Sequence, residues 1–413
     1  MKKSDVSIHI IGAGVSGLIA AQVLENNGYR PIIIEATDRV GGRLKTDIIE
    51  NYQLDHGFQV LLTSYPAARK YLDFEALELQ QFLPGASIFK EGKQAVLGDP
   101  LRNISLLFPT LFSGIGSIQD KLKVLSLNAK LKNKSLLEIF DTKEITTLAY
   151  LKEFGFSSQM IDTFFKPFFS GIFLESALKT SSRMFEFVYK MFGDGHAALP
   201  KAGIEAIPQQ LLEKLIHTNI RYNTIVSSIH DKEIIVSNGE KITTDIIIIA
   251  TDPTYLIKDF QKNPVIWKSC DTLYFETINR TISKPLIGLL PDAGDTYVNN
   301  IFYHTSIATH KETAHELLSV TVVKDHTLSD QELINRVEAE LKQYVGIDSC
   351  HFLKKYKISK ALPQLQNIKY NIKPLDTRYS STIFLAGDTQ LNGSLNAAML
   401  AGEAAALGVM ETL

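Results

Sequence analysis

Residues 6–43 read VSIHIIGAGVSGLIAAQVLENNGYRPIIIEATDRVGGR, and this stretch decides the fold. It begins with a β-branched run, Val6–Ile11, of the kind found in buried parallel strands. Glycines 12, 14 and 17 then give the spacing G-x-G-x-x-G, and the pattern over Ala13–Glu25 predicts a helix. A second strand, Ile32–Ile34, ends on Glu35. Strand, helix, strand and acid in this order predict the first βαβ unit of a dinucleotide-binding domain.

Each part of this unit has a physical role at a dinucleotide. Gly12 permits a tight turn, Gly14 lets the backbone approach a pyrophosphate, and Gly17 lets the helix pack closely on the strand. The N-terminus of the helix presents free N–H groups and a positive dipole end to the phosphates. Glu35 lies about 20 residues further on, where a carboxylate accepts hydrogen bonds from ribose hydroxyls. A plain glycine-rich turn and a secretory signal peptide are the alternatives, and the continuation into a second strand disfavours both.

Length and composition limit the class of protein. With 413 residues the chain is long for one core, so two domains are expected. A net charge of −2 argues against nucleic acid as a partner. Two cysteines, Cys270 and Cys350, indicate a reducing compartment, and we expect a cytoplasmic protein with no metal site. No apolar run reaches the roughly 18 residues of a membrane span.

Two further motifs favour FAD over NAD. Asp38–Arg43 reads DRVGGR, in which paired glycines let a second loop approach the pyrophosphate and an arginine adds a charge-assisted donor. Near the C-terminus, Ile383–Asp388 predicts a strand that ends in Gly-Asp, and Leu395 opens the last helix. With these motifs the chain resembles the superfamily of flavin-containing amine oxidases, phytoene desaturases and protoporphyrinogen oxidases, and most of all its phytoene desaturase-like branch. Residues 389–394 contain no cysteine, which implies non-covalent FAD.

The resemblance implies cofactor contacts along the whole chain. A D-x-G-type element at Asp55–Gly57 would pass beside the flavin ring, Val226 would lie near the adenine, and Asp388 would bond the ribityl chain or a pyrophosphate-bound water. The residues expected to bind FAD are Gly12, Ala13, Gly14, Val15, Ser16, Gly17, Glu35, Ala36, Arg39, Gly41, Gly42, Arg43, Gly57, Phe58, Gln59, Val226, Ala250, Thr251, Gly387, Asp388, Ser394, Leu395 and Asn396.

The expected fold is α/β. A Rossmann-like FAD-binding domain with a parallel sheet is predicted from residues 1–75, 200–255 and 371–413. Residues 76–199 and 256–370 are predicted to form a mixed α+β substrate-binding domain. Residues 76–199 lose the α/β pattern and are expected to be a mostly helical insert.

The substrate class depends on an aromatic run and on one serine. FFKPFFSGIF, Phe164–Phe173, fits either a helical core or a pocket for an apolar substrate. Pro167 and Gly171 are expected to bend the chain, so that some of these rings face the cleft between the domains. Ser394 stands where amine oxidases usually carry an aromatic residue of the amine cage.

We therefore expect an FAD-dependent oxidoreductase that dehydrogenates a small organic substrate by hydride transfer to flavin N5. An apolar or polyene-like substrate is favoured. Amine oxidation with oxygen as acceptor, protoporphyrinogen oxidation and a non-catalytic flavoprotein remain alternatives. The electron acceptor, oxygen or a quinone, and the oligomeric state stay open.

No catalytic residue is identified. His56, His196 and His304 are candidate bases only because imidazole titrates near neutral pH. Lys284 and Lys360 are the nearest candidates for the flavin-proximal lysine of the superfamily, and each is more typical of a surface lysine.

A membrane-surface contact is a further alternative. The apolar run Leu101–Ile118 precedes a lysine-rich stretch, a combination that fits docking on a membrane or a buried helix beside a solvated one. Pro109, Gly114 and Gly116 interrupt the run and favour the second interpretation.

Overall fold

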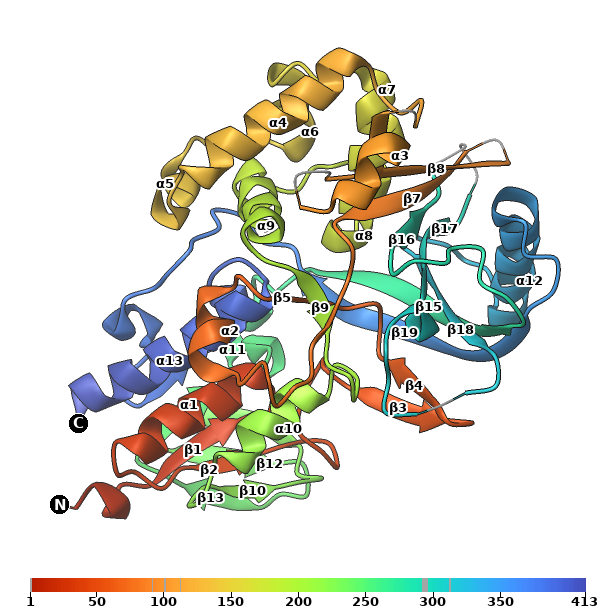
Figure 1. The fold of residues 1–413 in the computed structure, drawn as a ribbon. Coiled ribbons are helices and arrows are strands. Elements are labelled where there is room, and N and C mark those ends of the chain that lie inside the picture. Colours follow the sequence, from red (N-terminus) through yellow and green to blue (C-terminus); the bar gives the residue numbers. More distant parts are fainter. Residues whose placement is uncertain (1, 91, 100–101, 112, 292–295, 312) are drawn as a thin grey trace.

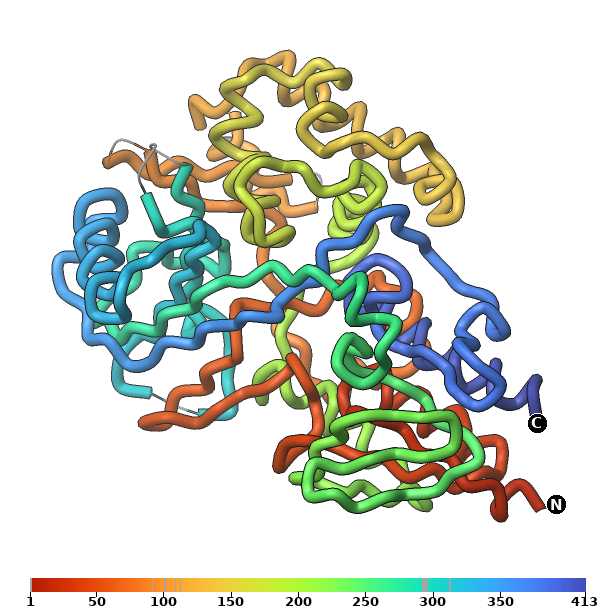
Figure 2. Tube along the Cα trace, turned by 180° about the vertical axis from the view of Figure 1, so that it is seen from behind, coloured from red at the N-terminus to blue at the C-terminus, as the bar shows by residue number. Residues whose placement is uncertain are grey.

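The computed structural model describes residues 2–90, 92–99, 102–111, 113–291, 296–311 and 313–413. Two larger sheets and a layer of helices make up the fold, with both termini beside the same sheet (Figures 1 and 2).

A five-stranded parallel sheet draws on three distant parts of the chain. Its order is β10-β2-β1-β14-β20, and all four strand pairs are parallel. The strands are β1 (Ile8–Ile11), β2 (Ile32–Ile34), β10 (Asn219–Arg221), β14 (Ile246–Ile249) and β20 (Ile383–Leu385). The predicted α/β class with a parallel sheet is confirmed.

Two helices from opposite ends of the chain pack on this sheet. Helix α1 (Val15–Asn26) starts at Gly14 as N-cap, two residues later than the sequence pattern indicated. The last helix, α13 (Leu395–Thr412), packs directly on α1, since a Cβ added at Gly402 would lie 2.2 Å from the Ser16 carbonyl oxygen. Only glycine allows so close an approach of the two backbones.

Small antiparallel elements decorate the parallel sheet. Strands β11 (Val226–His230), β12 (Glu233–Val236) and β13 (Lys241–Thr243) form a ribbon, and β3 (Thr46–Ile49) pairs with β4 (Tyr52–Asp55). A third small sheet joins β5 (Leu61–Leu62), β9 (Ala197–Leu199) and β6 (Gln80–Gln81). Helices α2 (Pro66–Tyr71), α10 (Ala206–Glu213) and α11 (Lys258–Gln261) lie in the same half of the molecule (Figure 1).

The second large sheet has seven strands in the order β19-β15-β18-β17-β16-β7-β8. Its strands are β7 (Gly85–Lys90), β8 (Lys93–Gly98), β15 (Trp267–Thr277), β16 (Ile287–Leu289), β17 (Val298–Tyr303), β18 (Glu316–Val322) and β19 (His351–Pro363). Helix α12 (Asp330–Glu340) packs its apolar residues Leu333 and Val337 against one face of this sheet. The opposite face is turned toward the residues described in the next subsection.

The region between residues 76 and 199 is only partly helical, which corrects one expectation. Its helices are α3 (Leu107–Leu111), α4 (Ile118–Lys132), α5 (Leu136–Asp141), α6 (Thr147–Glu153), α7 (Ser158–Met160), α8 (Lys166–Phe173) and α9 (Ser182–Asp194). Before them, β7 and β8 form a hairpin that extends the seven-stranded sheet. The division of the chain into two domains at the expected boundaries stays a prediction.

The aromatic run stays helical through Pro167 and Gly171, so neither residue interrupts it. Helix α7, a π-helical turn over Ile161–Phe165 and α8 follow one another without a break, and the N–H of Lys166 bonds to the carbonyl of Ile161, five residues back. The wider turn accommodates a proline that has no N–H to donate. Phe165 and Phe169 are buried and contact Phe185, which makes them part of the helical core.

No helix in the described ranges is long and apolar enough to cross a lipid bilayer. The cytoplasmic location expected from the cysteine content stays a prediction.

Candidate active site

The glycines of the first turn each meet a different demand. Gly12 has φ +105° and its N–H donates to the Ile34 carbonyl at 2.8 Å. A Cβ at Gly17 would lie 2.0 Å from the Gly12 carbonyl oxygen, so no larger residue fits there. At Gly14, by contrast, an added Cβ would find open space, with no described atom within 4 Å beyond its chain neighbours. The turn therefore leaves room for a ligand at Gly14 and nowhere else along these three glycines.

Glu35 ties the first turn to the second strand. Its Oε2 accepts the Ala13 N–H at 2.8 Å, and its Oε1 accepts the Thr37 N–H at 2.9 Å and the Thr37 hydroxyl at 2.8 Å. The side chain is buried. Because a carboxylate has about four lone-pair positions, these three bonds leave acceptor capacity for a ligand hydroxyl.

The second glycine loop lies against the first. The Gly41 N–H donates to the Ala13 carbonyl at 2.9 Å, and a Cβ at Gly42 would lie 3.4 Å from the Gly14 Cα. Gly41 and Gly42 both have positive φ, of +116° and +60°, which disfavours any other residue. The loop that follows Glu35 therefore closes over the same open space that Gly14 leaves.

Arg43 joins this loop to the C-terminal motif. One guanidinium nitrogen lies 2.6 Å from Asp388 Oδ1, and another donates to the Ala361 carbonyl at 3.1 Å. The Asp388 side chain is 6% exposed, whereas that of Arg43 is 39% exposed. The pair places a cation at the edge of the open space and holds Asp388 in a fixed position.

The C-terminal motif is attached directly to α1. Ser16 Oγ accepts the Gly387 N–H at 2.9 Å and donates to the Ala398 carbonyl at 2.5 Å. Ser394 caps α13 by accepting the Ala397 N–H at 3.0 Å, and Leu395 is the first residue of that helix. One hydroxyl therefore connects the first helix of the chain, the last strand and the last helix.

Asn396 carries an unpaired donor. Its Oδ1 accepts the Ala67 N–H at 3.0 Å, which fixes the amide, but its Nδ2 has no hydrogen-bond partner among the described residues. The residue is fully buried. Since a buried N–H without a partner costs about 1–3 kcal/mol, this donor fits a site that a polar ligand completes.

These features fit a bound dinucleotide. Open space at Gly14 and Gly42, free N–H groups at two helix starts, and the unpaired amide of Asn396 are suited to phosphates and to a polar ring edge. The remaining expected residues border this region. Ala250 donates its N–H to the Ile11 carbonyl at 2.9 Å, Thr251 follows it, and Val226 begins β11. Whether each of these residues contacts the cofactor stays a prediction.

The segment from Asp55 to Gln59 connects the first half of the site with the seven-stranded sheet. The Asp55 carbonyl accepts the hydroxyl of Tyr274, on β15, at 2.8 Å, and Gly57 has φ +98°. Gln59 Nε2 donates to the Arg43 carbonyl at 2.9 Å. Burial raises the pKa of the Asp55 carboxyl to about 6, although the Thr46 hydroxyl and the Ile204 N–H both donate to it.

An aromatic cluster covers this segment. The ring of Phe58 lies 5.2 Å from that of Phe302 and 6.1 Å from that of Phe82, and Phe82 and Phe302 stack at 4.5 Å. His304 meets Phe302 edge-on at 5.3 Å. The sequence analysis predicted Phe58 as a residue near the flavin and His304 as a candidate base. It did not predict that the two residues belong to one aromatic cluster.

Thr272 is the most informative residue that the sequence did not identify. It is fully buried on β15, its Oγ1 has no hydrogen-bond partner in the described part of the chain, and that oxygen lies 4.0 Å from a Cβ built at Gly57. Ser170, on α8, is a second buried residue whose hydroxyl lacks a described partner. The alternation of Thr272 and Tyr274 along a strand was the signal that could have placed Thr272 on the same face as Tyr274.

None of the three candidate histidines is placed as a free base. His304 Nε2 lies 3.0 Å from Ser319 Oγ, and burial lowers its pKa to about 4. His56 lies 2.8 Å from Asp47 Oδ2. Burial and the nearby Arg102 lower the pKa of His196. His304 therefore stays neutral at pH 7.

The candidate lysines are also accounted for. Lys360 donates to Asp252 Oδ2 at 2.8 Å, and Lys284 is exposed. Lys268, which the sequence did not single out, is partly buried and donates to the Phe173 carbonyl at 2.9 Å and to Thr180 Oγ1 at 3.0 Å. Burial lowers its pKa, and both of these bonds hold it beside the end of α8.

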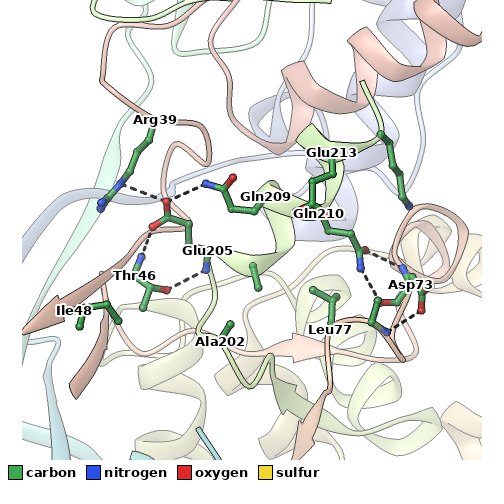
Figure 3. Close-up of a pocket in the computed structure, with 13 residues that line it drawn as sticks. Arg39, Thr46, Ile48, Asp73, Leu77, Ala202, Glu205, Gln209, Gln210 and Glu213 are labelled. Carbon is green, nitrogen blue, oxygen red and sulfur yellow. Dashed lines mark hydrogen bonds and ion pairs between the residues drawn. The ribbon is translucent and has the colours of Figure 1, made fainter. Parts of the chain in front are cut away.

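A surface hollow of about 580 Å³ lies beneath the Arg39 loop (Figure 3). Glu205 accepts the Thr46 N–H at 2.8 Å and lies 3.5 Å from Arg39 Nε, so it holds the loop that carries the second glycine pair. Asp73 and Glu213 also line the hollow, together with apolar residues such as Ile48 and Leu77. Only Arg39 among its lining residues belongs to the expected cofactor site.

The parallel sheet, the paired glycine turns and the helix starts beside them define a dinucleotide-binding α/β protein. The chain belongs to the family of flavin-containing amine oxidoreductases, whose model matches residues 15–410. It is therefore a flavoprotein oxidoreductase, with FAD as its cofactor. The superfamily expected from the two terminal motifs is confirmed.

Two curated proteins show what the sequence is similar to. It is 27% identical over 168 residues to protoporphyrinogen oxidase 2, chloroplastic/mitochondrial, of Arabidopsis thaliana, covering 40% of this chain and 32% of that protein. It is 26% identical over 267 residues to L-amino acid oxidase bordonein-L of Crotalus durissus terrificus, covering 59% of this chain and 50% of that protein. The matches thus span half or less of these relatives.

A structural match covers almost the whole chain. The crystal structure of an oxidoreductase from Methanosarcina mazei superposes with a TM-score of 0.73 at 15% identity, covering 98% of this chain and all of the other. At this identity the likeness concerns the fold.

Proposed function

We propose that this flavoprotein dehydrogenates a neutral, largely apolar organic substrate. The observation that supports the proposal is the uncharged face that the seven-stranded sheet turns toward Gly57 and Phe58. The substrate would lie between this face and the flavin.

Two cross-strand rows form the centre of that face. Register pairs Thr272 with Thr321 and Thr321 with Asn300 in the first row. In the second, Tyr274 pairs with Ser319 and Ser319 with Phe302. Side chains directly opposite one another share a face, so on β15, β17 and β18 neither row carries a charged side chain. The charged groups on the borders of this face are Lys354, exposed opposite Tyr274 on β19, and Glu276, which accepts the Tyr52 hydroxyl at 2.6 Å. A cationic amine or a free carboxylate would lose its hydration here without gaining an ion pair.

The chain's own groups would orient the substrate and exclude water. Phe58, Phe82 and Phe302 provide a stacked aromatic surface for an apolar skeleton. The free hydroxyl of Thr272 would bond one polar group of the substrate and so fix which C–H faces the cofactor. When bound, FAD supplies the acceptor for the hydrogen and electron pair that the substrate loses, and oxygen or a quinone would reoxidise it.

Amine oxidation fits this face less well than the proposed reaction does, whereas protoporphyrinogen oxidation is a dehydrogenation of the same class. Ser394 caps α13 and bonds Asn392 Oδ1 at 2.7 Å, so it offers nothing in place of the missing cage aromatic of amine oxidases. The helical aromatic run no longer supports an apolar substrate, because Phe165 and Phe169 belong to the core. Protoporphyrinogen has an apolar macrocycle but also two propionate carboxylates, which this face would not pair. We retain its oxidation as the second candidate, with the macrocycle on this face and the carboxylates outside it.

Product analysis tests the proposal. FAD-loaded protein is incubated with a panel of polyene precursors, a porphyrinogen, primary amines, polyamines and L-amino acids, and the products are weighed by mass spectrometry. We expect a loss of two hydrogens from a polyene precursor or the porphyrinogen. Conversion of amines or amino acids alone would contradict the proposal, as would a flavoprotein that converts no compound of the panel.

A further inference from the structure

The apolar run before α4 is only partly a surface feature. Leu106 and Ile115 are buried, whereas Ile104 and Leu111 are 74% and 54% exposed. The start of the run, Leu101, lies outside the described residues. The exposed apolar residues continue beyond the run, into α4.

Helix α4 is apolar on two opposite faces. Leu127 and Leu131 point into the core and are fully buried. Ile118, Leu122 and Leu125, at i, i+4 and i+7, are 79%, 60% and 42% exposed. A helix on the surface of a globular protein normally carries polar residues on its outer face, so the outer stripe of α4 needs another explanation.

Further exposed apolar side chains lie close to the outer stripe in the sequence. Fifteen large apolar side chains are exposed among the described residues, and six of them lie between residues 104 and 137. We call these six the apolar platform: Ile104, Leu111, Ile118, Leu122, Leu125 and Leu137. Lys121 Nζ donates to the Leu111 carbonyl at 3.1 Å, which ties the end of α3 to the start of α4. Both views place α4 and α5 at the edge of the molecule farthest from the parallel sheet (Figures 1 and 2).

Positive charge accompanies the platform. Helix α4 carries four lysines, Lys121, Lys123, Lys130 and Lys132, and one acid, Asp120. Asp120 is buried and bonded within the capping box. Lys130 lies 3.2 Å from Glu186 and Lys123 donates to the Gly155 carbonyl, so Lys121 and Lys132 are the cations beside the outer stripe. Exposed aliphatic side chains bordered by lysines are the composition of helices that lie in the interface of anionic membranes.

We propose that the apolar platform docks this protein on the surface of an anionic lipid bilayer, with α4 lying parallel to the membrane plane. Ile118, Leu122 and Leu125 would enter the acyl boundary while Lys121 and Lys132 remain at the headgroups. A second copy of the chain fits the platform less well, because a symmetric contact would bring the lysines of two α4 helices together. The proposal is independent of the substrate class.

Vesicle sedimentation tests the proposal. FAD-loaded protein is mixed with large vesicles of phosphatidylglycerol and phosphatidylcholine, and with vesicles of phosphatidylcholine alone. We expect binding to the anionic vesicles that weakens with added salt. The triple variant Ile118→Ser, Leu122→Ser, Leu125→Ser should bind at least about 30-fold more weakly, since three aliphatic side chains no longer leave water. Lys132→Gln should reduce binding roughly fivefold.

The matched control is the pair Ile216→Ser and Ile278→Ser, which removes two apolar side chains that are 81% and 73% exposed in other parts of the fold. It should bind vesicles as the unmodified chain does. All variants should keep their FAD content and melting temperature, because the altered side chains contact mainly solvent. Absent vesicle binding would overturn the proposal. So would equal losses in test and control variants, or lipid-free dimers that the triple variant abolishes.

Discussion

At the scale of single residues, unpaired groups locate the site more sharply than the motifs do. The glycine spacing predicted the open turn, and the structure leaves space for a ligand specifically at Gly14. Asn396 and Thr272 carry buried polar atoms without described partners. The C-terminal motif allowed Asn396 to be predicted as a site residue from the sequence. Thr272 could be identified only from the pairing of β15 with its neighbouring strands.

Glu35 tests the adenosine end of the site. In the Glu35→Ala variant we expect FAD binding to weaken by about 2–3 kcal/mol, the scale of hydrogen bonds to a charged group. Because Glu35 also accepts the Ala13 N–H, the free protein should lose stability as well. Fluorescence titration of the apoprotein with FAD measures the first effect and urea unfolding the second.

Asp38→Ala, at an exposed neighbouring position, is the control for Glu35→Ala and should leave both quantities unchanged. FAD affinity that is equal in the Glu35→Ala variant and the unmodified protein would remove Glu35 from the site.

Asp55 makes stability depend on pH. Its folded-state pKa of about 6 lies above the ordinary value of 3.8, so the folded protein loses stability as pH rises from about 4 to about 6. Asp55→Asn keeps the acceptor for Thr46 and Ile204 but cannot ionise. The variant should therefore gain up to about 3 kcal/mol relative to the unmodified protein between pH 4 and pH 7.

Urea unfolding of both FAD-loaded proteins at the two pH values measures this difference. An effect of the Asp55→Asn substitution that is the same at pH 4 and pH 7 would show that Asp55 does not titrate in this range.

At the scale of elements, the sequence pattern predicted helices and strands well where a regular spacing of apolar residues continued over many residues. The prediction failed at Pro167. Residues 329–332 carry the sequence pattern of a capping box, and α12 begins there. The turns at Asp231 and Asn238 join β11, β12 and β13. Pro167 was expected to bend the chain, but a π-helical turn accommodates it and the helical run continues; no sequence periodicity signals such a turn.

Helix α4 is held to α9 by a buried acid, which gives a prediction for these two elements. Glu186, on α9, bonds Lys134 and lies 3.2 Å from Lys130 Nζ and 2.7 Å from the Tyr150 hydroxyl. The pKa of Glu186 is lowered: burial opposes its ionisation, but the contacts with Lys134 and Tyr150 outweigh this. Its ionised form therefore stabilises the fold above the ordinary value of 4.5, and this stabilisation is lost as pH falls.

Glu186→Gln should destabilise the protein by about 2–3 kcal/mol at pH 7, because Lys134 is left without its anion. The loss should shrink at pH 4, where the acid of the unfolded chain is largely protonated. Chemical denaturation at the two pH values measures it, with Glu153→Gln on α6 as an exposed control. A loss equal in both variants would show that the α4–α9 contact does not depend on this charge.

At the scale of the whole molecule, both ends of the chain build one site. Ser16 bonds Gly387 and Ala398, and Arg43 bonds Asp388, across more than 340 residues of sequence. The two terminal motifs made this meeting predictable, because each is specific for a flavin fold. The face of the seven-stranded sheet was not predictable in the same way, since its two rows depend on the register of three strands that no motif specifies.

The central claim is that a neutral, largely apolar substrate is dehydrogenated against this uncharged face. Anaerobic stopped-flow mixing of the FAD-loaded protein with single compounds measures it most directly, through the loss of the oxidised flavin absorbance. The account predicts fast, saturable bleaching by a polyene precursor or a porphyrinogen, and slower bleaching in the Thr272→Val variant. Bleaching by polyamines or L-amino acids, with none by the polyene precursor or the porphyrinogen, would contradict it.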